Sequence, residues 1–420
     1  MSTRNYFDPI YNSISLDSSK AEERMVIKLI DSYPFQRLRR IKQLGPASLT
    51  FHGAESSRFN HSLGVFHLAR RTLNILIKSN PHLKEFRYLL YGAALLHDLG
   101  HGPLSHTSEE AFGFKHEYWT AKLIREQADI SNPLENFKEG SSNQIADLIE
   151  FSRSPNKAIL SIVSSQLDCD RLDYLLRDSH TTGTKYGQID LERILSAITI
   201  APDGDLAINP KGIMAVEHYL VIRNIMYRSI YNHRLNEVCN WLLERIIETA
   251  RRLGPSKVWA DEYMSKWLWE KESVNAKVFL ANDDILTGYH LFRWGEESPK
   301  PLNQLCKRLL NRNLLKALDI GNFKNELQLE ALAMARRITK KSGSDPDSCC
   351  GLRTHKSYGY HPYKGGLRTW DGVNLRALEK SSNLVKSLIE PYKSAWLIFP
   401  KEIEIELSLE LKNINDNLII

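Results

Sequence analysis

The stretch LLHDLGHGPLSHTSEE, residues 95–110, joins an apolar helical sequence to a dense group of polar side chains. It contains three histidines, one aspartate and two glutamates, and Gly102-Pro103 ends its helical character. Burying so many polar groups costs stability unless they are paired or bind a ligand. The preceding residues, 87–96, are apolar on nearly every side, which predicts a helix at the centre of the core. The stretch therefore places a candidate functional site next to the core.

His97-Asp98 is the first candidate for a metal site. Divalent metals favour imidazole nitrogens and carboxylate oxygens that converge from rigid elements. His61 begins a segment, 61–79, whose apolar residues recur every three or four positions, as on a helix with one buried face. The local pattern alone also fits an ordinary helix end capped by a hydrogen-bonded aspartate. Further carboxylates come from residues 165–179, which contain Asp168, Asp170, Asp173 and Asp178.

The composition is that of an ordinary soluble globular protein. Of 420 residues, 42% are hydrophobic and 25% are charged. The net charge of +6 suits anionic ligands such as nucleotides, whereas binding to nucleic acid is not indicated. We expect no membrane-spanning helix and no secretory signal. An odd, scattered set of five cysteines favours a reduced, cytoplasmic protein without a zinc pattern.

Helical patterns dominate the chain, and residues 216–253 predict one or two long helices. Strand-like sequence is sparse: AITI and LAIN flank the turn at 202–205, and AWLIFP and IEIELSL follow near the end. Residues 345–366 have the composition of a linker or long loop. We therefore predict a mostly α fold, with a helical body over 1–340 and a small mixed α/β C-terminal lobe over 341–420.

The set His61, His97-Asp98 and Asp170 resembles the H…HD…D signature of the HD-domain metal-dependent phosphohydrolases. More narrowly, PFQRLRRIKQLG, SSRFNHSLGVFHLA, LLHDLGHGPLSH and LDCDRLDYLLRDSHTTG resemble the deoxynucleoside triphosphate (dNTP) triphosphohydrolases, the branch with the SAM-and-HD-domain enzymes and bacterial dGTPases. The resemblance covers about residues 5–340. It implies an all-α core and one divalent ion (Mn, Fe, Co, Ni or Mg) held by His61, His97, Asp98 and Asp170.

Spacing and resemblance together predict catalytic residues in the segment that follows His97-Asp98. His106 and Glu109 are three residues apart, so they face each other on a helical turn, where a carboxylate raises the basicity of an imidazole. The resemblance implies a catalytic histidine–carboxylate pair here and a phosphate contact at His116. His101 is a further candidate. Surface histidines and an ordinary i,i+3 pair are the alternatives.

Positions that match the family's substrate and regulatory contacts follow from the resemblance alone. The substrate set is Gln43, Leu44, Arg58, Arg171, Tyr174, Asp178, Arg223, Tyr231 and His233. Arginine suits a triphosphate, Tyr174 and Asp178 suit the deoxyribose 3′-hydroxyl, and Leu44 leaves no room for a 2′-hydroxyl. The regulatory set, for a guanine nucleotide, is Asp31, Gln36 and Arg39. These positions also fit ordinary packing, and DPIYN (8–12) departs from the family's DPIHG.

The predicted activity is hydrolysis of dNTPs at the α-phosphate to deoxynucleoside and inorganic triphosphate. Two alternatives stay open: another HD activity, as nuclease or nucleoside-monophosphate phosphatase, and a nucleotide-sensing oligomer with an inactive site. The expected partners are a dNTP, an activating nucleotide and further copies of the chain, as a tetramer or larger.

Overall fold

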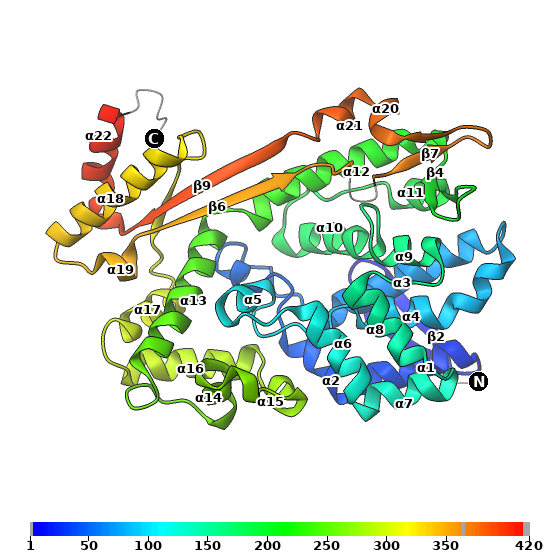
Figure 1. Ribbon diagram of the computed structural model, residues 1–420, viewed down its shortest axis with the longest axis horizontal. Helices are drawn as coiled ribbons and strands as arrows, with labels where there is room; N and C mark the ends of the chain where they lie inside the picture. The colour runs from blue at the N-terminus through cyan, green and yellow to red at the C-terminus, as the bar shows by residue number, and fades with distance from the viewer. Residues whose placement is uncertain (1–2, 363–365, 415–420) are drawn as a thin grey trace.

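The computed structural model describes residues 3–362 and 366–414, and helices dominate it (Figure 1). The prediction of a mostly α fold is confirmed. The first helices are α1 (Ala21–Asp31), α2 (Tyr33–Arg37), α3 (Arg58–Leu76), α4 (Arg87–Leu96), α5 (His106–Phe112), α6 (His116–Glu126), α7 (Ala128–Phe137), α8 (Ser141–Phe151), α9 (Lys157–Val163) and α10 (Cys169–Thr182). The later ones are α11 (Leu191–Ala197), α12 (Ile213–Met226), α13 (Arg234–Leu253), α14 (Glu262–Trp269), α15 (Ala276–Ala281), α16 (Asp284–Glu297), α17 (Leu302–Leu310), α18 (Asn325–Lys341), α19 (Pro346–Cys349), α20 (Leu378–Ser381), α21 (Asn383–Ser387) and α22 (Glu404–Ile414).

Within the described residues the strands form small sheets with two, four and three strands. They are β1 (Thr3–Asp8), β2 (Asn12–Asp17), β3 (Ile198–Ile200), β4 (Leu206–Ile208), β5 (Lys316–Asp319), β6 (Gly351–Tyr358), β7 (Arg368–Trp370), β8 (Leu375–Ala377) and β9 (Pro391–Phe399). β3 and β4 pair around the turn expected at 202–205. The hairpin of β1 and β2 was not predicted, because its exposed face carries no apolar alternation strong enough to mark it.

Helix α4 lies at the centre of the core, and every residue from Tyr88 to Leu96 is buried. It packs against α3 and α8, and the site is built where α4 ends. Two glycines allow close helix packing. A Cβ at Gly64 of α3 would lie 1.8 Å from Asp173 of α10, and a Cβ at Gly92 of α4 would lie 2.4 Å from Ile145 of α8. Glycine at these points lets α3 pack closely on α10, and α4 on α8.

The most extended feature is a two-stranded ribbon of β6 and β9, which runs across α13 toward α20 and α21 (Figure 1). The strands are antiparallel, in a register from Gly351↔Ile398 to Tyr358↔Pro391. β5 pairs with the other edge of β9. The ribbon packs closely on the helical body, since a Cβ at Gly351 would lie 2.3 Å from Trp241 of α13.

Two local predictions are wrong. IEIELSL alternates like a strand, yet it spans a short 3-10 turn and α22, because Ile403, Leu407 and Leu411 are spaced four apart and bury one helical face. The expected loop at 345–366 contains α19 and β6; pairing with β9 overrides its turn-rich composition. Residues 363–365 of that segment lie outside the described residues.

The division at residue 340 stays a prediction. A second, smaller apolar cluster joins Ala331, Ala335 and Ile338 of α18 to Leu397 of β9 and Leu407 of α22. This cluster therefore joins residues on both sides of the predicted boundary at residue 340. In the part of the chain that the structure describes, no helix combines the length and apolar character needed to cross a membrane.

Candidate metal centre and active site

Three predicted metal ligands meet where α3, α4 and α10 converge. His61 Nε2 lies 3.0 Å from Asp170 Oδ1 and 3.3 Å from His97 Nε2. One ligand atom from each of the three residues lies within 4.8 Å of the others. Asp98 borders this group, with Oδ1 3.4 Å from His97 Nε2 and Oδ2 3.5 Å from His61 Nε2. The structure thus brings all four predicted ligands together.

A second layer of side chains orients His61. Its Nδ1 lies 2.8 Å from Asp173 Oδ2, so the Nε2 atom faces the cluster. Asp173 in turn accepts hydrogen bonds from Arg177, which also donates to Asp8 of the N-terminal hairpin. Carboxylates behind a histidine fix its orientation in metal sites. Together with the two imidazoles and two carboxylates of the cluster, this arrangement fits a divalent transition metal.

Arg58 joins the metal cluster to the next segment of the site. The buried guanidinium forms an ion pair with Asp98, and its Nε donates to Ser105 Oγ at 2.8 Å. Burial alone would raise the pKa of Asp98, but Arg58 and the neighbouring histidines hold it well below its usual range. Arg58 was predicted to bind phosphate; here it fixes Asp98 and Ser105.

The two residues before His106 have a strained backbone conformation. Leu104 and Ser105 have φ of 59° and 56°, which costs residues with a Cβ about 1–3 kcal/mol each. Contacts from elsewhere hold them: Asp284 Oδ1 accepts from Leu104 N at 2.7 Å, and Ser105 Oγ donates to Lys42 O. This turn starts α5 with His106, whose side chain is 68% exposed. The backbone therefore presents His106 to the surface beside the metal cluster.

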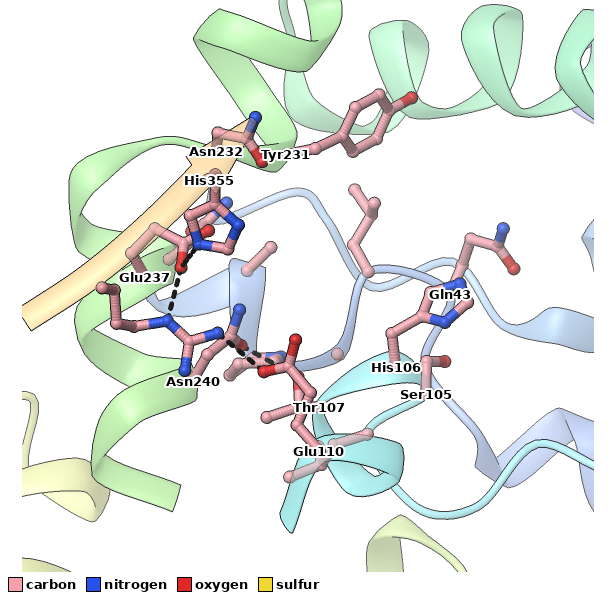
Figure 2. A pocket seen from close by; sticks show the side chains of 17 residues that line it. Gln43, Ser105, His106, Thr107, Glu110, Tyr231, Asn232, Glu237, Asn240 and His355 are labelled. Atoms are coloured by element: carbon pink, nitrogen blue, oxygen red, sulfur yellow. Dashed lines mark hydrogen bonds and ion pairs between the residues drawn. The ribbon is translucent and has the colours of Figure 1, made fainter. Parts of the chain in front are cut away.

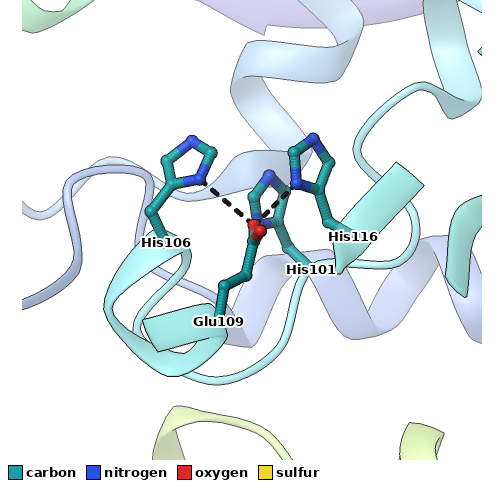
Figure 3. A group of neighbouring side chains, drawn as sticks. All are labelled: His101, His106, Glu109 and His116. Carbon is teal, nitrogen blue, oxygen red and sulfur yellow. Dashed lines mark hydrogen bonds and ion pairs between the residues drawn. The ribbon is translucent and has the colours of Figure 1, made fainter. Parts of the chain in front are cut away.

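Glu109 contacts three histidines at once, as Figure 3 shows. Its Oε1 lies 3.1 Å from His106 Nδ1, 2.6 Å from His116 Nδ1 and 3.5 Å from His101 Nδ1. Burial raises the pKa of Glu109, but hydrogen bonds with His106 and His116 outweigh it and lower that pKa to about 2. The predicted pair of His106 and Glu109 is in contact, and the sequence did not indicate that His116 shares the same carboxylate.

His101 lies between the two groups. It is fully buried, with Nε2 3.2 Å from Asp98 Oδ1, and its ring stacks on His116 with centroids 4.0 Å apart. Burial lowers its pKa well below the usual range, so the ring is neutral. The set of His101, His106, Glu109 and His116 also has donor atoms close enough to hold an ion. Hydrogen bonds to the shared carboxylate account for the approach of His106 and His116, whereas both ring nitrogens of His101 are buried without a hydrogen-bond partner.

Tyr174 and Asp178, predicted for the sugar, lie on α10 beside Tyr231, which was predicted for the base and follows α12. Tyr231 donates a hydrogen bond to Asp178 Oδ2 at 2.9 Å, and the rings of Tyr174 and Tyr231 meet edge to face at 5.7 Å. Burial raises the pKa of Asp178 to about 7 despite this hydrogen bond. Its other oxygen, Oδ1, has no hydrogen-bond partner. Asp178 therefore offers a buried acceptor beside Tyr231.

A pocket of about 270 Å³ opens beside His106, and we call it the His106 pocket (Figure 2). It includes the predicted Gln43, Leu44, His106 and Tyr231. His233 does not line the pocket, although its neighbour in sequence, Asn232, does. The Nδ1 atom of His233 accepts a hydrogen bond from Leu235 N at the start of α13. Sequence analysis missed several further lining residues: Asn232, Asn236, Glu237, Asn240, Arg353 and His355. Arg353 and His355 come from β6, which the loop-like composition concealed.

A second pocket, of about 560 Å³, lies on the metal side, and we call it the His97 pocket. Its lining includes His97, Lys115, His116, Asp170 and Arg171. Arg171 forms an ion pair with Asp168 and donates to Ser165 O at 2.6 Å. Arg223 is outside this lining, buried, with Nη1 3.3 Å from Gln166 O. His106 and His116, with ring centroids 5.3 Å apart, stand between the two pockets.

The predicted regulatory residues are neighbours at the surface, and each has a partner within the chain. Asp31 pairs with Arg4 at 2.5 Å, and Gln36 donates to Ile30 O at 2.7 Å. Arg39 donates to Gln36 Oε1 at 2.8 Å and lies over the ring of Phe59.

Comparison with known proteins agrees with this geometry. Residues 58–178 match the HD domain, and residues 189–259 match the HD-associated region. The uncharacterized protein YwfO of Bacillus subtilis is 32% identical over 408 residues, covering 94% of this chain and 92% of YwfO. The chain therefore belongs to the HD-domain phosphohydrolase family, in the branch that resembles the dNTP triphosphohydrolases.

Two further proteins resemble this chain, one in sequence and one in fold. A protein of Dictyostelium discoideum named deoxynucleoside triphosphate triphosphohydrolase SAMHD1 homolog is 28% identical over 333 residues. That match covers 75% of this chain but only 61% of the Dictyostelium protein. The crystal structure of a phosphohydrolase from Bacteroides thetaiotaomicron superimposes with a TM-score of 0.83, over 95% of this chain and all of that chain. Its identity is 24%, so this likeness concerns the fold.

Proposed function

We propose that the chain is a metal-dependent triphosphohydrolase that cleaves dNTPs at the α-phosphate. The observation that carries the proposal is the position of His106 and His116 between two pockets, with the metal cluster on one side. A dNTP is long enough to occupy both. The sugar and base enter the His106 pocket beside Leu44 and Tyr231, and the phosphates enter the His97 pocket beside Lys115 and Arg171.

In this proposal His61, His97, Asp98 and Asp170 hold the ion. A bound divalent ion polarises the phosphate and lowers the pKa of water. Water would attack the α-phosphorus on the side opposite O5′, with one of its protons passing to solvent. The bond from phosphorus to O5′ would break, so the deoxynucleoside would depart through O5′ and the inorganic triphosphate would keep the new oxygen. The O5′ atom needs a proton to depart as an alcohol. His106 supplies it from Nε2, because Nδ1 faces Glu109.

The protein also orients the substrate. Asp178 Oδ1 accepts from the 3′-hydroxyl of the deoxyribose, and Leu44 occupies the space that a 2′-hydroxyl needs. His101 and His116 are aligned by ring stacking and by Glu109, so they present ring nitrogens toward the phosphates. The triphosphate must compete with Asp98 and Asp168 for Arg58 and Arg171.

Because Arg58 and Arg171 already have carboxylate partners, one alternative is favoured: a phosphatase for nucleoside monophosphates, which needs fewer unpaired arginine or lysine side chains. Purified protein incubated with Mn²⁺ or Mg²⁺ and each dNTP, dNMP or NTP, followed by chromatography, separates the two. Deoxynucleoside plus inorganic triphosphate supports the proposal. Turnover of monophosphates alone supports the alternative and refutes the proposal.

We also propose that Asp31, Gln36 and Arg39 bind an activating nucleotide within a homo-oligomer, a tetramer or larger. The support is the family resemblance and the clustering of the three residues on one surface. Light scattering at micromolar concentration, with and without each nucleotide, tests this. A monomer under every condition would refute the oligomer and the regulatory site together.

A further inference from the structure

The wall of the His106 pocket opposite Leu44 is held by one arginine of the C-terminal ribbon. Arg353 of β6 donates to Glu110 Oε2 at 2.6 Å, to Glu237 Oε2 at 2.8 Å and to Glu244. Its side chain is only 10% exposed. Figure 2 shows Glu237 and His355 facing each other and Glu110 below them, at the junction of β6, α13 and α5. One cation thus joins three carboxylates from two helices.

The chemistry of this junction requires arginine. A guanidinium offers five donors in a rigid plane, whereas a lysine ammonium is a point charge. Without the guanidinium, Glu110 of α5 and Glu244 of α13 would lose this ion-pair partner, and Glu237 would keep only His355, whose Nε2 lies 2.7 Å from Glu237 Oε2. Removing one partner of a buried ion cluster leaves repulsion and unpaired charge. Arg353 therefore helps to hold α5 against α13, together with the hydrogen bond from Thr107 to Asn240.

Helix α5 depends on such outside contacts. It has seven residues, too few for an independently stable helix, and it begins after the strained turn at Leu104 and Ser105. At its other end, Arg251 donates to Ala111 O at 2.9 Å. Glu110 follows Glu109 directly and lies one helical turn after His106. A shift of Glu110 therefore moves both members of the proposed acid pair.

We propose that Arg353 is a positioning residue: by holding Glu110 against α13, it sets the place of His106 and Glu109. This inference rests on the proposed function for its catalytic consequence. Arg353 lies outside both matched regions, 58–178 and 189–259, so on this proposal a residue of the C-terminal ribbon takes part in arranging the site. The Arg353 contact acts through α5, since Arg353 is separated from the metal cluster by the His106 pocket.

The first test is a double-mutant cycle with His106. Arg353→Met should lower kcat by about 10–100-fold, the scale of a small misplacement of a catalytic group, with KM changing less. In a His106→Ala background the same change should cost no further activity, because the two residues act through one step. An equal loss in both backgrounds, or an unchanged kcat, would overturn the proposal.

Two milder variants guard against misfolding. Arg353→Lys keeps the charge but reaches fewer carboxylates, so kcat should fall between wild type and Arg353→Met. Glu110→Gln, at a side chain 48% exposed, should lower kcat in the same way while leaving the fold intact. Arg336→Met is the matched control, since Arg336 pairs with Asp347 on the surface of the small cluster. A loss of kcat in the control equal to that in Arg353→Met would overturn the proposal.

The second test does not use activity. Hydrogen–deuterium exchange of the amides in 106–112 should speed up in Arg353→Met and stay unchanged in Arg336→Met. If the wild-type protein hydrolyses no dNTP yet exchange speeds up in this segment, the proposed function fails and the positioning role stands. If exchange in 106–112 is unchanged by Arg353→Met, the positioning role fails, whatever the activity.

Discussion

The metal cluster and the His106 pocket lie side by side but are assembled in different ways. The cluster consists of the predicted ligands His61 of α3, His97 and Asp98 just after the end of α4, and Asp170 of α10, which helical packing brings together. The pocket takes its walls from a turn at Leu44, the start of α13 and the distant strand β6. Helical packing builds the metal cluster. The His106 pocket also depends on β6, which lies about 250 residues after His106 in the chain. The two regions meet at His106, which lines the pocket and which the contacts of Arg353 are proposed to position.

The strongest way to break this comparison is to remove a metal ligand. Asp170→Asn keeps the shape of the side chain but loses the charge that attracts the ion. We expect bound metal to fall to trace levels and activity to fall to background, because the ion supplies several kcal/mol of transition-state stabilisation. Metal analysis and dNTP turnover measure both. Asp147→Asn, at an exposed ion pair on α8, is the control; a fully loaded, active Asp170→Asn protein would contradict the assignment.

The next effect concerns His106, which stands at the border of the two regions. His106→Ala should keep the metal and lower kcat by about 10²–10⁴-fold, the usual contribution of a positioned acid. Glu109→Gln should cost less in kcat and should also raise KM, since His116 loses its charged partner too. The exposed His82 gives the control, His82→Ala. A His106→Ala protein without metal would make this residue a ligand, and one with full activity would make it a bystander.

The same division explains what the sequence could predict. His61, His97, Asp98 and Asp170 stand in a spaced signature on periodic helices, so their convergence could be inferred. Arg353 and His355 could not, because a turn-rich composition hid a strand whose partner, β9, lies about 40 residues away. Glu109 was found through its i,i+3 spacing from His106, whereas the approach of His116 depends on the fold. Pairing between distant segments leaves no local pattern.

A smaller effect is expected on the sugar, inside the pocket. Leu44→Ala opens space where a 2′-hydroxyl would sit, so the preference for dGTP over GTP in kcat/KM should shrink. One small contact is worth about 1–3 kcal/mol, so the change should be tens-fold at most. Competition assays with both nucleotides measure it, with metal content as a check that the cluster is untouched. An unchanged ratio would remove Leu44 from sugar selection.

The smallest effect is a pH dependence that comes from Asp178, which accepts a hydrogen bond from Tyr231 of the His106 pocket, and not from the metal cluster. Burial raises the pKa of Asp178 to about 7, so the carboxyl is protonated below that pH and ionised above it. Only the ionised form leaves Oδ1 free to accept from the 3′-hydroxyl, so kcat/KM should fall about tenfold from pH 8 to pH 6.

The free energy of unfolding should change with pH in the opposite direction to kcat/KM. The folded protein holds a proton that the unfolded chain releases near pH 4, so this group's contribution to stability declines as pH rises toward 7. Asp178→Asn should flatten the kcat/KM profile in this range and leave metal binding intact. A profile that keeps its slope in Asp178→Asn would assign the titration to another group and separate Asp178 from substrate binding.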